Sequence, residues 1–293
     1  CTSTSVTEKY QDKRNDIINV KDKVIEFETG NVLIGSVSRL YMSNKCLLIA
    51  DHKSVDKQIH IFNKNDFSYL TSIGNFGEGP EEITVMGCLA IDEAHHQLYV
   101  SDHAKQKIFS YDMDSVMVDS LYKPQVKTAM NETLFPSEYQ YINDTLSIAV
   151  LIKPTSTSTF NQFLGRWNMN TGEMIPMKYT HPDIQKKRIT FAASEKAGIY
   201  VECYTRHDLM TICSLDGELL YNIYGPDWDG GNGNKLQSFG TVMIGNDKIF
   251  VSYCGEDYAR DSFPTKILVF DLEGNYLKTL ETGYKISDCC YDS

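Results

Sequence analysis

The stretch IGNFGEGPEEI, residues 73–83, places three glycines within six residues and follows them with a proline and two glutamates. A loop of this kind either cradles a phosphate or connects two repeats of a β-sheet fold. A phosphate cradle needs the N-terminus of a helix directly behind the glycines. The residues that follow, ITVMGCLAID (83–92), have the composition of a strand instead. The stretch is therefore predicted to be the crossover from the outer strand of one sheet to the inner strand of the next.

One apolar strand pattern recurs along the chain, with starts at residues 47, 98, 146, 199 and 249. The segments are LLIAD (47–51), LYVSD (98–102), LSIAV (146–150), IYVEC (199–203) and IFVSY (249–253). A period of about 50 residues indicates a repeat architecture. Most of these strands are followed by a polar turn and a second strand, such as IFSYD (108–112) or ILVFD (267–271), and then by a third extended run.

The repeat predicts an all-β chain. β-branched and aromatic residues dominate the extended runs, as strands prefer, and no segment shows the helical spacing of apolar residues. Asp216-Gly217 and Glu273-Gly274 supply the positive φ angles that tight hairpins need. Small antiparallel sheets that repeat in this way fit a β-propeller of the six-bladed type. In such a fold each sheet is a blade that buries both of its faces against its neighbours.

The crossover at 73–83, together with LAID (89–92), LYVSD (98–102) and KIFSYD (107–112), resembles the NHL-repeat and TolB-like six-bladed propellers. The resemblance is strongest to lipoprotein propellers whose blades join through a G.GPEE turn, and by repeat spacing it extends over residues 24–290. It implies six blades and an extracytoplasmic location. It implies no catalytic residue, because the family has no agreed catalytic motif.

The last blade is expected to be incomplete. A sixth inner strand would begin about 50 residues after residue 249, whereas the sequence ends at residue 293. YKISDCCYD (284–292) is predicted to be the inner strand of this blade. VIEFE (24–28) is predicted to add an N-terminal strand that helps to close the ring.

The first residues predict a lipid-anchored protein. Cys1 is followed by the polar run TSTSVTEKYQDKRND, which cannot bury enough apolar surface to fold. This arrangement resembles a mature bacterial lipoprotein, whose N-terminal cysteine carries the lipid. We therefore expect lipidation at Cys1, a tether over residues 1–20 and a single propeller domain over residues 21–293. The protein is expected to be lipid-anchored in the bacterial cell envelope, facing the periplasm or the outer surface.

The overall charge excludes one class of partner. The chain of 293 residues has 28 Lys and Arg against 39 Asp and Glu, which gives a formal net charge of −11. An acidic surface repels phosphate backbones, so nucleic acid is not an expected partner. No basic run indicates binding to a membrane surface, and contact with a membrane is expected only through the lipid on Cys1.

The seven cysteines beyond Cys1 do not predict a zinc site, because they form no CxxC pair. Cys203 and Cys213 flank a predicted hairpin. They either form a disulfide in an oxidising compartment or remain small buried thiols, and the second interpretation is favoured.

Candidate binding residues occur at or near the same place in three blades: Asp51-His52, Asp102-His103 and Arg206-His207-Asp208. Such residues could line a binding mouth, or hold a metal if they converge. The structural alternative is that each Asp side chain bonds backbone N–H groups of its own turn. Recurrence at a repeat position favours this alternative. His95 and His96 lie in a turn between strands and are expected to be solvated.

The long crossover GPDWDGGNGNKLQSFG (225–240) is a second candidate region. Its oxygen-bearing side chains are weak candidates for calcium ligands: Asp227, Asp229, Asn232 and Asn234. The loop lacks the glutamate that the twelfth position of an EF-hand requires, so no cofactor is expected. Trp228 is expected to be an exposed aromatic residue of a binding mouth.

The sequence predicts binding rather than catalysis. It contains no G-x-S-x-G, HExxH or S-x-x-K motif. The main hypothesis is a non-enzymatic binding or scaffold lipoprotein that presents loops and an axial mouth to a protein, peptide or glycan, with 18 Tyr and 13 Phe to supply ring faces. The alternative is a metal-dependent lactonase- or lyase-type propeller enzyme with an axial site. That alternative requires three or more Asp, Glu, Asn or His side chains to converge on one cation.

Overall fold

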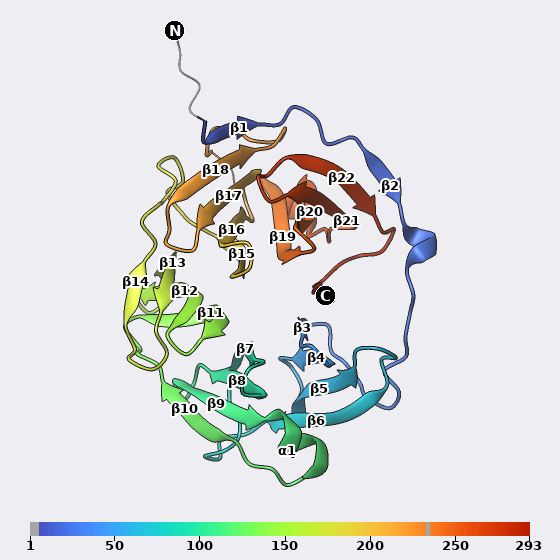
Figure 1. The fold of residues 1–293 in the computed structure, drawn as a ribbon, viewed down its shortest axis with the longest axis vertical. Helices are drawn as coiled ribbons and strands as arrows, with labels where there is room; N and C mark the ends of the chain where they lie inside the picture. The colour runs from blue at the N-terminus through green and yellow to red at the C-terminus, as the bar shows by residue number, and fades with distance from the viewer. Residues whose placement is uncertain (1–5, 233–234) are drawn as a thin grey trace. The chain divides into compact units, whose positions relative to one another are not determined.

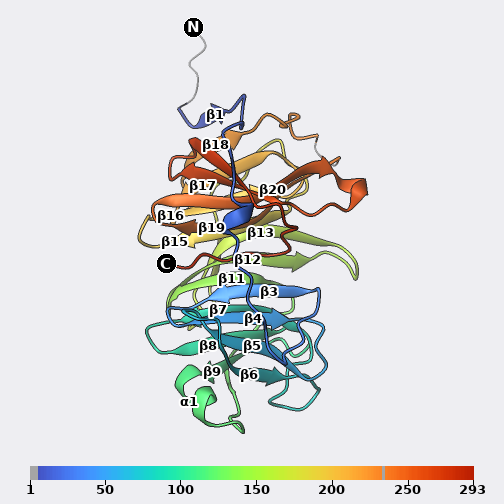
Figure 2. The ribbon, with the colours of Figure 1, turned by 90° about the vertical axis from the view of Figure 1, so that its right-hand side faces the viewer.

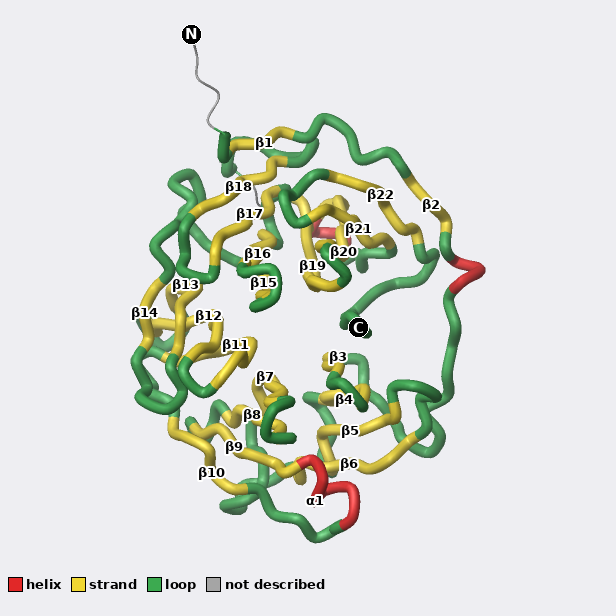
Figure 3. Tube along the Cα trace, viewed as in Figure 1, coloured by secondary structure: helices red, strands yellow, loops and turns green. Residues whose placement is uncertain are grey.

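Two compact units make up the chain in a computed structural model, which describes residues 6–232 and 235–293. One unit is Glu26–Pro176, and the other combines Cys1–Ile25 with Met177–Ser293. Strands dominate each unit (Figure 3), and within the described residues they form five sheets. In every sheet, strands that are consecutive in the sequence pair antiparallel, as predicted for the blades of an all-β repeat.

The unit Glu26–Pro176 contains three four-stranded sheets (Figure 1). The first sheet consists of β3 (Ser38–Met42), β4 (Cys46–Asp51), β5 (Lys57–Asn63) and β6 (Tyr69–Asn75). The second consists of β7 (Met86–Asp92), β8 (Gln97–Asp102), β9 (Lys107–Asp112) and β10 (Gln125–Ala129). The third consists of β11 (Phe135–Asn143), β12 (Leu146–Pro154), β13 (Phe160–Trp167) and β14 (Met174–Pro176). The recurring apolar segments of the sequence fall on β4, β8 and β12.

The other unit contains two five-stranded sheets. One is built from β15 (Ile189–Ser194), β16 (Ile199–Tyr204), β17 (Leu209–Ser214) and β18 (Leu219–Tyr224). The second is built from β19 (Leu236–Gly245), β20 (Lys248–Asp257), β21 (Lys266–Asp271) and β22 (Tyr276–Glu281). The fifth strand of each sheet comes from the N-terminal segment: β1 (Glu8–Tyr10) runs parallel to β18, and β2 (Ile17–Asn19) runs parallel to β22.

One short helix, α1 (Met113–Val118), corrects the expectation that no segment is helical. It lies beside β6 and β9 (Figure 2). Asp112 caps its N-terminus, because its side chain accepts a hydrogen bond of 2.7 Å from the Ser115 backbone N–H. Met113 and Met117 lie on the same face of the helix and pack against the core of the neighbouring sheets. The described residues also include the single 3₁₀ turns η1 (Lys21–Lys23) and η2 (Tyr258–Arg260).

Apolar side chains fill the space between neighbouring sheets within each unit. In Glu26–Pro176 one core lies between the first and second sheets, and another lies between the second and third. In the other unit one core joins the two sheets. β4 and β16 are buried along their whole length. Their near-continuous apolar runs are what strands covered on both faces require, and each buried Leu or Ile contributes about 1.5–3 kcal/mol.

The glycine-rich stretch connects β6 to β7, which confirms the predicted crossover. Gly74 has a φ of 77°, a conformation that favours glycine. The Glu82 carboxylate accepts a hydrogen bond of 2.8 Å from the Gly79 N–H. Lys105 Nζ donates to the Gly79 carbonyl at 2.5 Å and also to the Glu82 carbonyl. The backbone groups of the loop are therefore bonded within the protein, and a strand rather than a helix follows them.

The predicted N-terminal strand at residues 24–28 is not formed. Its place on the sheets is taken by β1 and β2, which come from the segment whose composition predicted a tether. The Asn222 N–H donates to the Thr7 carbonyl and the Thr279 N–H to the Asp16 carbonyl, at 2.7 and 2.8 Å. Parallel pairing with β18 and β22 thus supplies the hydrogen-bond partners that these three-residue strands need. Cys1, the predicted lipidation site, lies outside the described residues, so lipidation remains a prediction.

The predicted inner strand at residues 284–292 is also not formed. This segment forms no strand ladder and is attached to its unit by one backbone hydrogen bond, from the Ile286 N–H to the Pro264 carbonyl at 2.8 Å, and by side chains. Asp288 accepts a hydrogen bond of 2.7 Å from the Thr241 hydroxyl, and the Tyr291 ring stacks on Phe250 with 5.5 Å between centroids. Tyr291 also occupies the space over Gly245, where a Cβ would lie 2.2 Å from the ring.

Cys203 and Cys213 do not form the disulfide considered from the sequence; both are free and buried. In the register of β16 and β17, Cys203 lies opposite Met210 and Cys213 lies opposite Tyr200. The two cysteines are therefore not cross-strand neighbours. The favoured interpretation, small buried thiols, describes them correctly.

Arg14 anchors the N-terminal segment to its unit through a buried ion pair. Its Nη1 lies 2.7 Å from Asp208 Oδ1, and the two side chains are 5% and 0% exposed. Gly225 makes room for the pair, because a Cβ there would lie 2.2 Å from Asp208 Oδ2 and 2.3 Å from Arg14 Nη2. Burial raises the pKa of the Asp208 carboxyl, and Arg14 opposes this effect.

Arg14→Met leaves Asp208 buried without its cation, so we expect the free energy of unfolding to fall by about 3–5 kcal/mol at neutral pH. Because the pKa of Asp208 is raised in the folded state, folding favours the protonated carboxyl. The loss should therefore shrink as the pH falls from neutral through that raised pKa. Urea unfolding of both proteins over a pH series measures this. Arg260→Met, which breaks an exposed pair with Glu256, is the control and should have far less effect; equal losses would contradict the anchoring role.

We expect Cys203 and Cys213 to be unreactive in the folded protein at neutral pH. Burial raises the pKa of the Cys203 thiol and raises that of Cys213 to about 12, so neither forms the reactive thiolate. Iodoacetamide should alkylate both only after unfolding in urea without reductant, as read by peptide mass spectrometry. A cross-linked Cys203–Cys213 peptide would contradict the strand register.

Candidate functional site

The carboxylates of Asp51 and Asp102 hold backbone at the ends of β4 and β8. Asp51 accepts hydrogen bonds from the Gly35 N–H at 2.8 Å and the Lys53 N–H at 3.0 Å. Asp102 accepts four, from the N–H groups of Thr84, Val85, Ala104 and Lys105. Both side chains are buried. This geometry agrees with the structural alternative, in which each Asp side chain bonds backbone N–H groups of its own turn. Each Asp also bonds the backbone N–H of a neighbouring segment.

The adjacent histidines are half-buried. Burial lowers the pKa of both His52 and His103. His52 Nδ1 lies 3.1 Å from the Met86 carbonyl oxygen. His103 occupies the space over Gly87, where a Cβ would lie 2.2 Å from Nε2. The two rings are packed among backbone groups in the neutral form, and no carboxylate cluster that could hold a metal includes them among the described residues.

The candidates of the other unit are packed against aromatic rings. The Arg206 guanidinium lies 3.1 Å from the centroid of the Tyr258 ring. Trp228, expected to be exposed, is only partly so, because its ring packs against Tyr224 and His207 with centroids 4.8 and 6.0 Å apart. His207 itself is buried. A tryptophan in a polar loop was expected to be exposed, but the rings of Tyr224, His207 and His181 pack against it.

One candidate calcium ligand of the long crossover already has a side-chain partner within the protein. Asp227 Oδ2 accepts a hydrogen bond of 2.6 Å from the Tyr253 hydroxyl. The Asn232 amide donates to the Asp229 carbonyl at 3.0 Å. Asn234 lies outside the described residues. These residues therefore remain only weak candidates for calcium ligands.

A cavity of about 430 Å³ opens in the unit Glu26–Pro176, between the first two sheets and α1. Its apolar lining comes from both sheets and from the helix: Cys46, Leu48, Leu70, Ile91, Leu98, Met113 and Met117. Its polar lining is concentrated in the turns: Ser43, Lys45, Asn63, Asp92, Glu93, His96, Gln97 and Asp114. The cavity has an apolar interior with polar groups that can orient a ligand, which is the usual make-up of a binding pocket.

Two of the polar groups at the pocket are fixed by neighbours. Glu93 Oε1 accepts a hydrogen bond of 2.6 Å from the Asn44 N–H, and His96 Nδ1 lies 3.1 Å from Asp114 Oδ2. Burial raises the pKa of the Cys46 thiol, and a hydrogen bond with Ser43 only partly offsets this. Cys46 therefore lines the pocket as a protonated thiol and not as a nucleophile.

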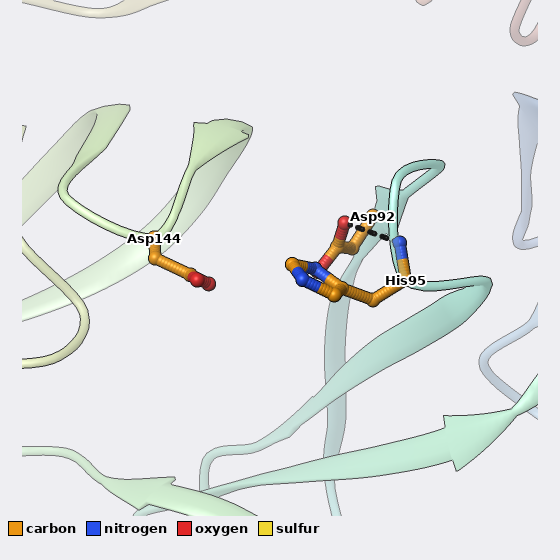
Figure 4. Close-up of side chains that lie close together, drawn as sticks. All are labelled: Asp92, His95 and Asp144. Carbon is orange, nitrogen blue, oxygen red and sulfur yellow. Dashed lines mark hydrogen bonds and ion pairs between the residues drawn. The ribbon is translucent and has the colours of Figure 1, made fainter.

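A second group of side chains converges at the turns β7–β8 and β11–β12 of the same unit. Asp92, His95 and Asp144 each place one potential ligand atom within 4.8 Å of the others (Figure 4). Burial acts to raise the pKa of the Asp92 carboxyl, but hydrogen bonds from Tyr99 and His95 outweigh it and hold this pKa below its usual value. The sequence interpretation placed His95 in solvent and did not connect it to Asp144. One sequence signal could have indicated this group: His95 and Asp144 each follow the first strand of a blade, so their turns occupy equivalent positions in two consecutive blades.

The sheets and the repeat define the class of the molecule as an all-β propeller. Residues 3–163 match the DUF5128 family, which is described as a 6-bladed beta-propeller, and the match spans more than half of the chain. The chain belongs to this family. The predicted fold class is confirmed, while the narrower resemblance to NHL-repeat and TolB-like propellers remains a prediction. No curated protein matches the chain.

Solved structures support the same fold. A protein of Bacteroides fragilis NCTC 9343 named as exported aligns with a TM-score of 0.56 and 14% identity, covering 94% of this chain and 80% of that one. A member of the DUF4221 family from Bacteroides vulgatus ATCC 8482 aligns with a TM-score of 0.52 and 9% identity, covering 83% and 80%. U3-55K aligns with a TM-score of 0.58 and 10% identity, covering 89% and 87%. At these identities the similarity concerns the fold alone.

Among the described residues, no helix combines the length and apolar character that crossing a membrane requires.

Proposed function

We propose that the chain is an exported, non-enzymatic binding module whose pocket receives bulky apolar side chains of a peptide or protein partner. The pocket in Glu26–Pro176 is the observation that carries this proposal. Its volume of about 430 Å³ lies within the range of ~300–1,000 Å³ of ligand sites. Buried anchor side chains in pockets of this kind supply most of the affinity of many protein interfaces.

The apolar lining suits an anchor of variable shape. Met113 and Met117 project from one face of α1, and Leu48 and Leu98 come from the two sheets. Methionine side chains are flexible and polarisable, so they adapt to different apolar partners. The short helix thus provides an adjustable wall beside rigid strands.

The charged groups at the pocket favour a partner with basic residues next to its apolar anchor. Glu93 and Asp114 are acidic and Lys45 is the basic residue of the lining. The Asp114 side chain is 75% exposed, so it can meet a partner's Lys or Arg. The net charge of the whole chain, −11, acts in the same direction by attracting cationic partners.

Binding is a better account of the pocket than catalysis. The Cys46 thiol is kept protonated by burial. The Asp92, His95 and Asp144 group shares only Asp92 with the pocket lining, so an ion held by His95 and Asp144 would not face an apolar ligand in the pocket. The metal-dependent lactonase- or lyase-type enzyme considered from the sequence is not what we propose.

Export is supported by a structural neighbour that is named as an exported protein. We propose a location in the bacterial cell envelope with a lipid on Cys1. Mass spectrometry of the protein from its native membrane would show acyl chains on the N-terminal peptide, and an unmodified peptide would contradict the anchor.

A peptide-display library screened against the untagged chain tests the pocket. We expect enrichment of peptides with a bulky apolar residue beside Lys or Arg. Met117→Glu places a charge in the pocket and should weaken these peptides about tenfold or more, because the buried charge loses its hydration. Leu70→Glu places a charge in the same pocket at a partly exposed position. It should weaken binding as well, and it keeps the test valid if Met117→Glu does not fold. Fluorescence polarisation measures the affinities.

Val118→Glu is the matched control. Val118 lies on α1 next to Met117 but is 87% exposed and does not line the pocket, so binding should be unchanged. Enriched peptides that bind all variants equally would contradict the pocket assignment. Failure to enrich any peptide, with binding on a glycan array instead, would overturn the choice of partner.

A further inference from the structure

The turns β7–β8 and β11–β12 bring an imidazole and two carboxylates together. β7 and β11 pack side by side within the unit Glu26–Pro176, so the turns that follow them lie next to each other. The atoms of Asp92, His95 and Asp144 that could bind a metal lie within 4.8 Å of one another. The His95 side chain is 60% exposed, whereas that of Asp92 is 1% exposed. The group is thus anchored on the buried side and open to solvent on the other.

Asp92 fixes the tautomer and orientation of His95. Its Oδ2 lies 2.8 Å from His95 Nδ1, and its Oδ1 accepts the His95 backbone N–H at 3.2 Å. The Tyr99 hydroxyl donates to the same Oδ2 at 2.8 Å. An ionised carboxylate only accepts hydrogen bonds, so His95 Nδ1 carries a proton, and in the neutral imidazole Nε2 is then the nitrogen with the lone pair. Figure 4 shows the ring edge that bears Nε2 facing the Asp144 carboxylate.

Asp144 is held in place from its own side. The Tyr141 hydroxyl donates to Asp144 Oδ1 at 2.5 Å. Tyr141 in turn packs edge-to-face on Tyr99, with ring centroids 5.3 Å apart. The two carboxylates are therefore supported by a connected pair of tyrosines, one bonded to Asp92 and the other to Asp144. Tyr141 bonds Oδ1 of Asp144, and Figure 4 shows this carboxylate directed toward the His95 ring.

We propose that His95 Nε2 and the Asp144 carboxylate bind a divalent transition-metal ion of the Zn²⁺ type, with water in the remaining positions. A buried carboxylate that accepts Nδ1–H while Nε2 binds the metal is the usual support of a metal-bound histidine. Mixed nitrogen and oxygen ligands suit Zn²⁺, whereas Ca²⁺ and Mg²⁺ prefer oxygen alone. The candidate ligand atoms lie within 4.8 Å of one another, and a shared ion with metal–ligand bonds of about 2.0–2.2 Å would draw them closer together.

Titration of the untagged chain with Zn²⁺ tests the site. Isothermal calorimetry should show one equivalent bound. His95→Ala should abolish this binding, and Asp144→Asn should weaken it about tenfold or more, because each removes one of two direct ligands. Asp92→Asn should weaken it by about 10–100-fold, the usual effect of losing the group that orients a metal-bound histidine. Thermal unfolding of each variant without metal separates loss of the site from loss of the fold.

His96→Ala is the matched control. His96 follows His95 directly and is also exposed, and its Nδ1 also contacts a carboxylate, at 3.1 Å from Asp114 Oδ2. It has no second carboxylate in a ligand cluster with it among the described residues. Its replacement should leave Zn²⁺ affinity unchanged.

Cu²⁺ provides a spectroscopic check that does not depend on affinity. Electron paramagnetic resonance of the one-equivalent complex should show coupling to one imidazole nitrogen in the native chain and in His96→Ala, and none in His95→Ala. Three results would each overturn the proposal: no stoichiometric uptake, Zn²⁺ affinity insensitive to Asp144→Asn, or equal losses in His95→Ala and His96→Ala. The last two would mean that lone surface imidazoles bind the metal.

Discussion

Each sheet of this chain has two apolar faces, and both must be removed from water. The remaining structure depends on that constraint. A sheet on its own would leave the faces of strands such as β4 and β16 exposed, although these strands are buried along their whole length in their units. Burial against neighbouring sheets within each unit satisfies the requirement. Because the faces are largely committed to packing, the polar candidate groups are found mainly at the turns and strand ends.

The buried carboxylates show how the sheets are joined at those ends. Asp51, Asp102 and Asp208 each accept backbone N–H groups that lie well outside their own turn, from Gly35, from Thr84 and Val85, and from Asp227. A buried carboxylate is costly unless several donors satisfy it. For Asp208 the cation of Arg14 completes the set, and this ties the N-terminal segment to the sheet. The recurrence of Asp at one repeat position thus reflects the joining of segments rather than a shared ligand site.

The sequence predicted what depends on long apolar runs and missed what depends on single contacts. The inner strands and the 73–83 crossover could be predicted because branched and aromatic runs recur with a period. β1 and β2 could not, since their three residues each carry no pattern and form only by pairing with β18 and β22. Helix α1, with six residues, is too short to show periodicity. The group around His95 was missed because it joins turns of two blades, and only packing of β7 against β11 shows which turns meet.

Asp92 illustrates why one residue can belong to both candidate sites without merging them. It ends β7, so it contributes to the wall of the pocket, while its carboxylate turns to His95 and Tyr99. Those hydrogen bonds keep the carboxylate ionised despite its burial, and an ionised Asp92 fixes the His95 imidazole with its lone pair directed outward. On the pocket side, burial raises the pKa of the Cys46 thiol, and a hydrogen bond with Ser43 only partly offsets this. Cys46 therefore remains a neutral group of the pocket lining, whereas the hydrogen bonds to Asp92 maintain the carboxylate that orients His95.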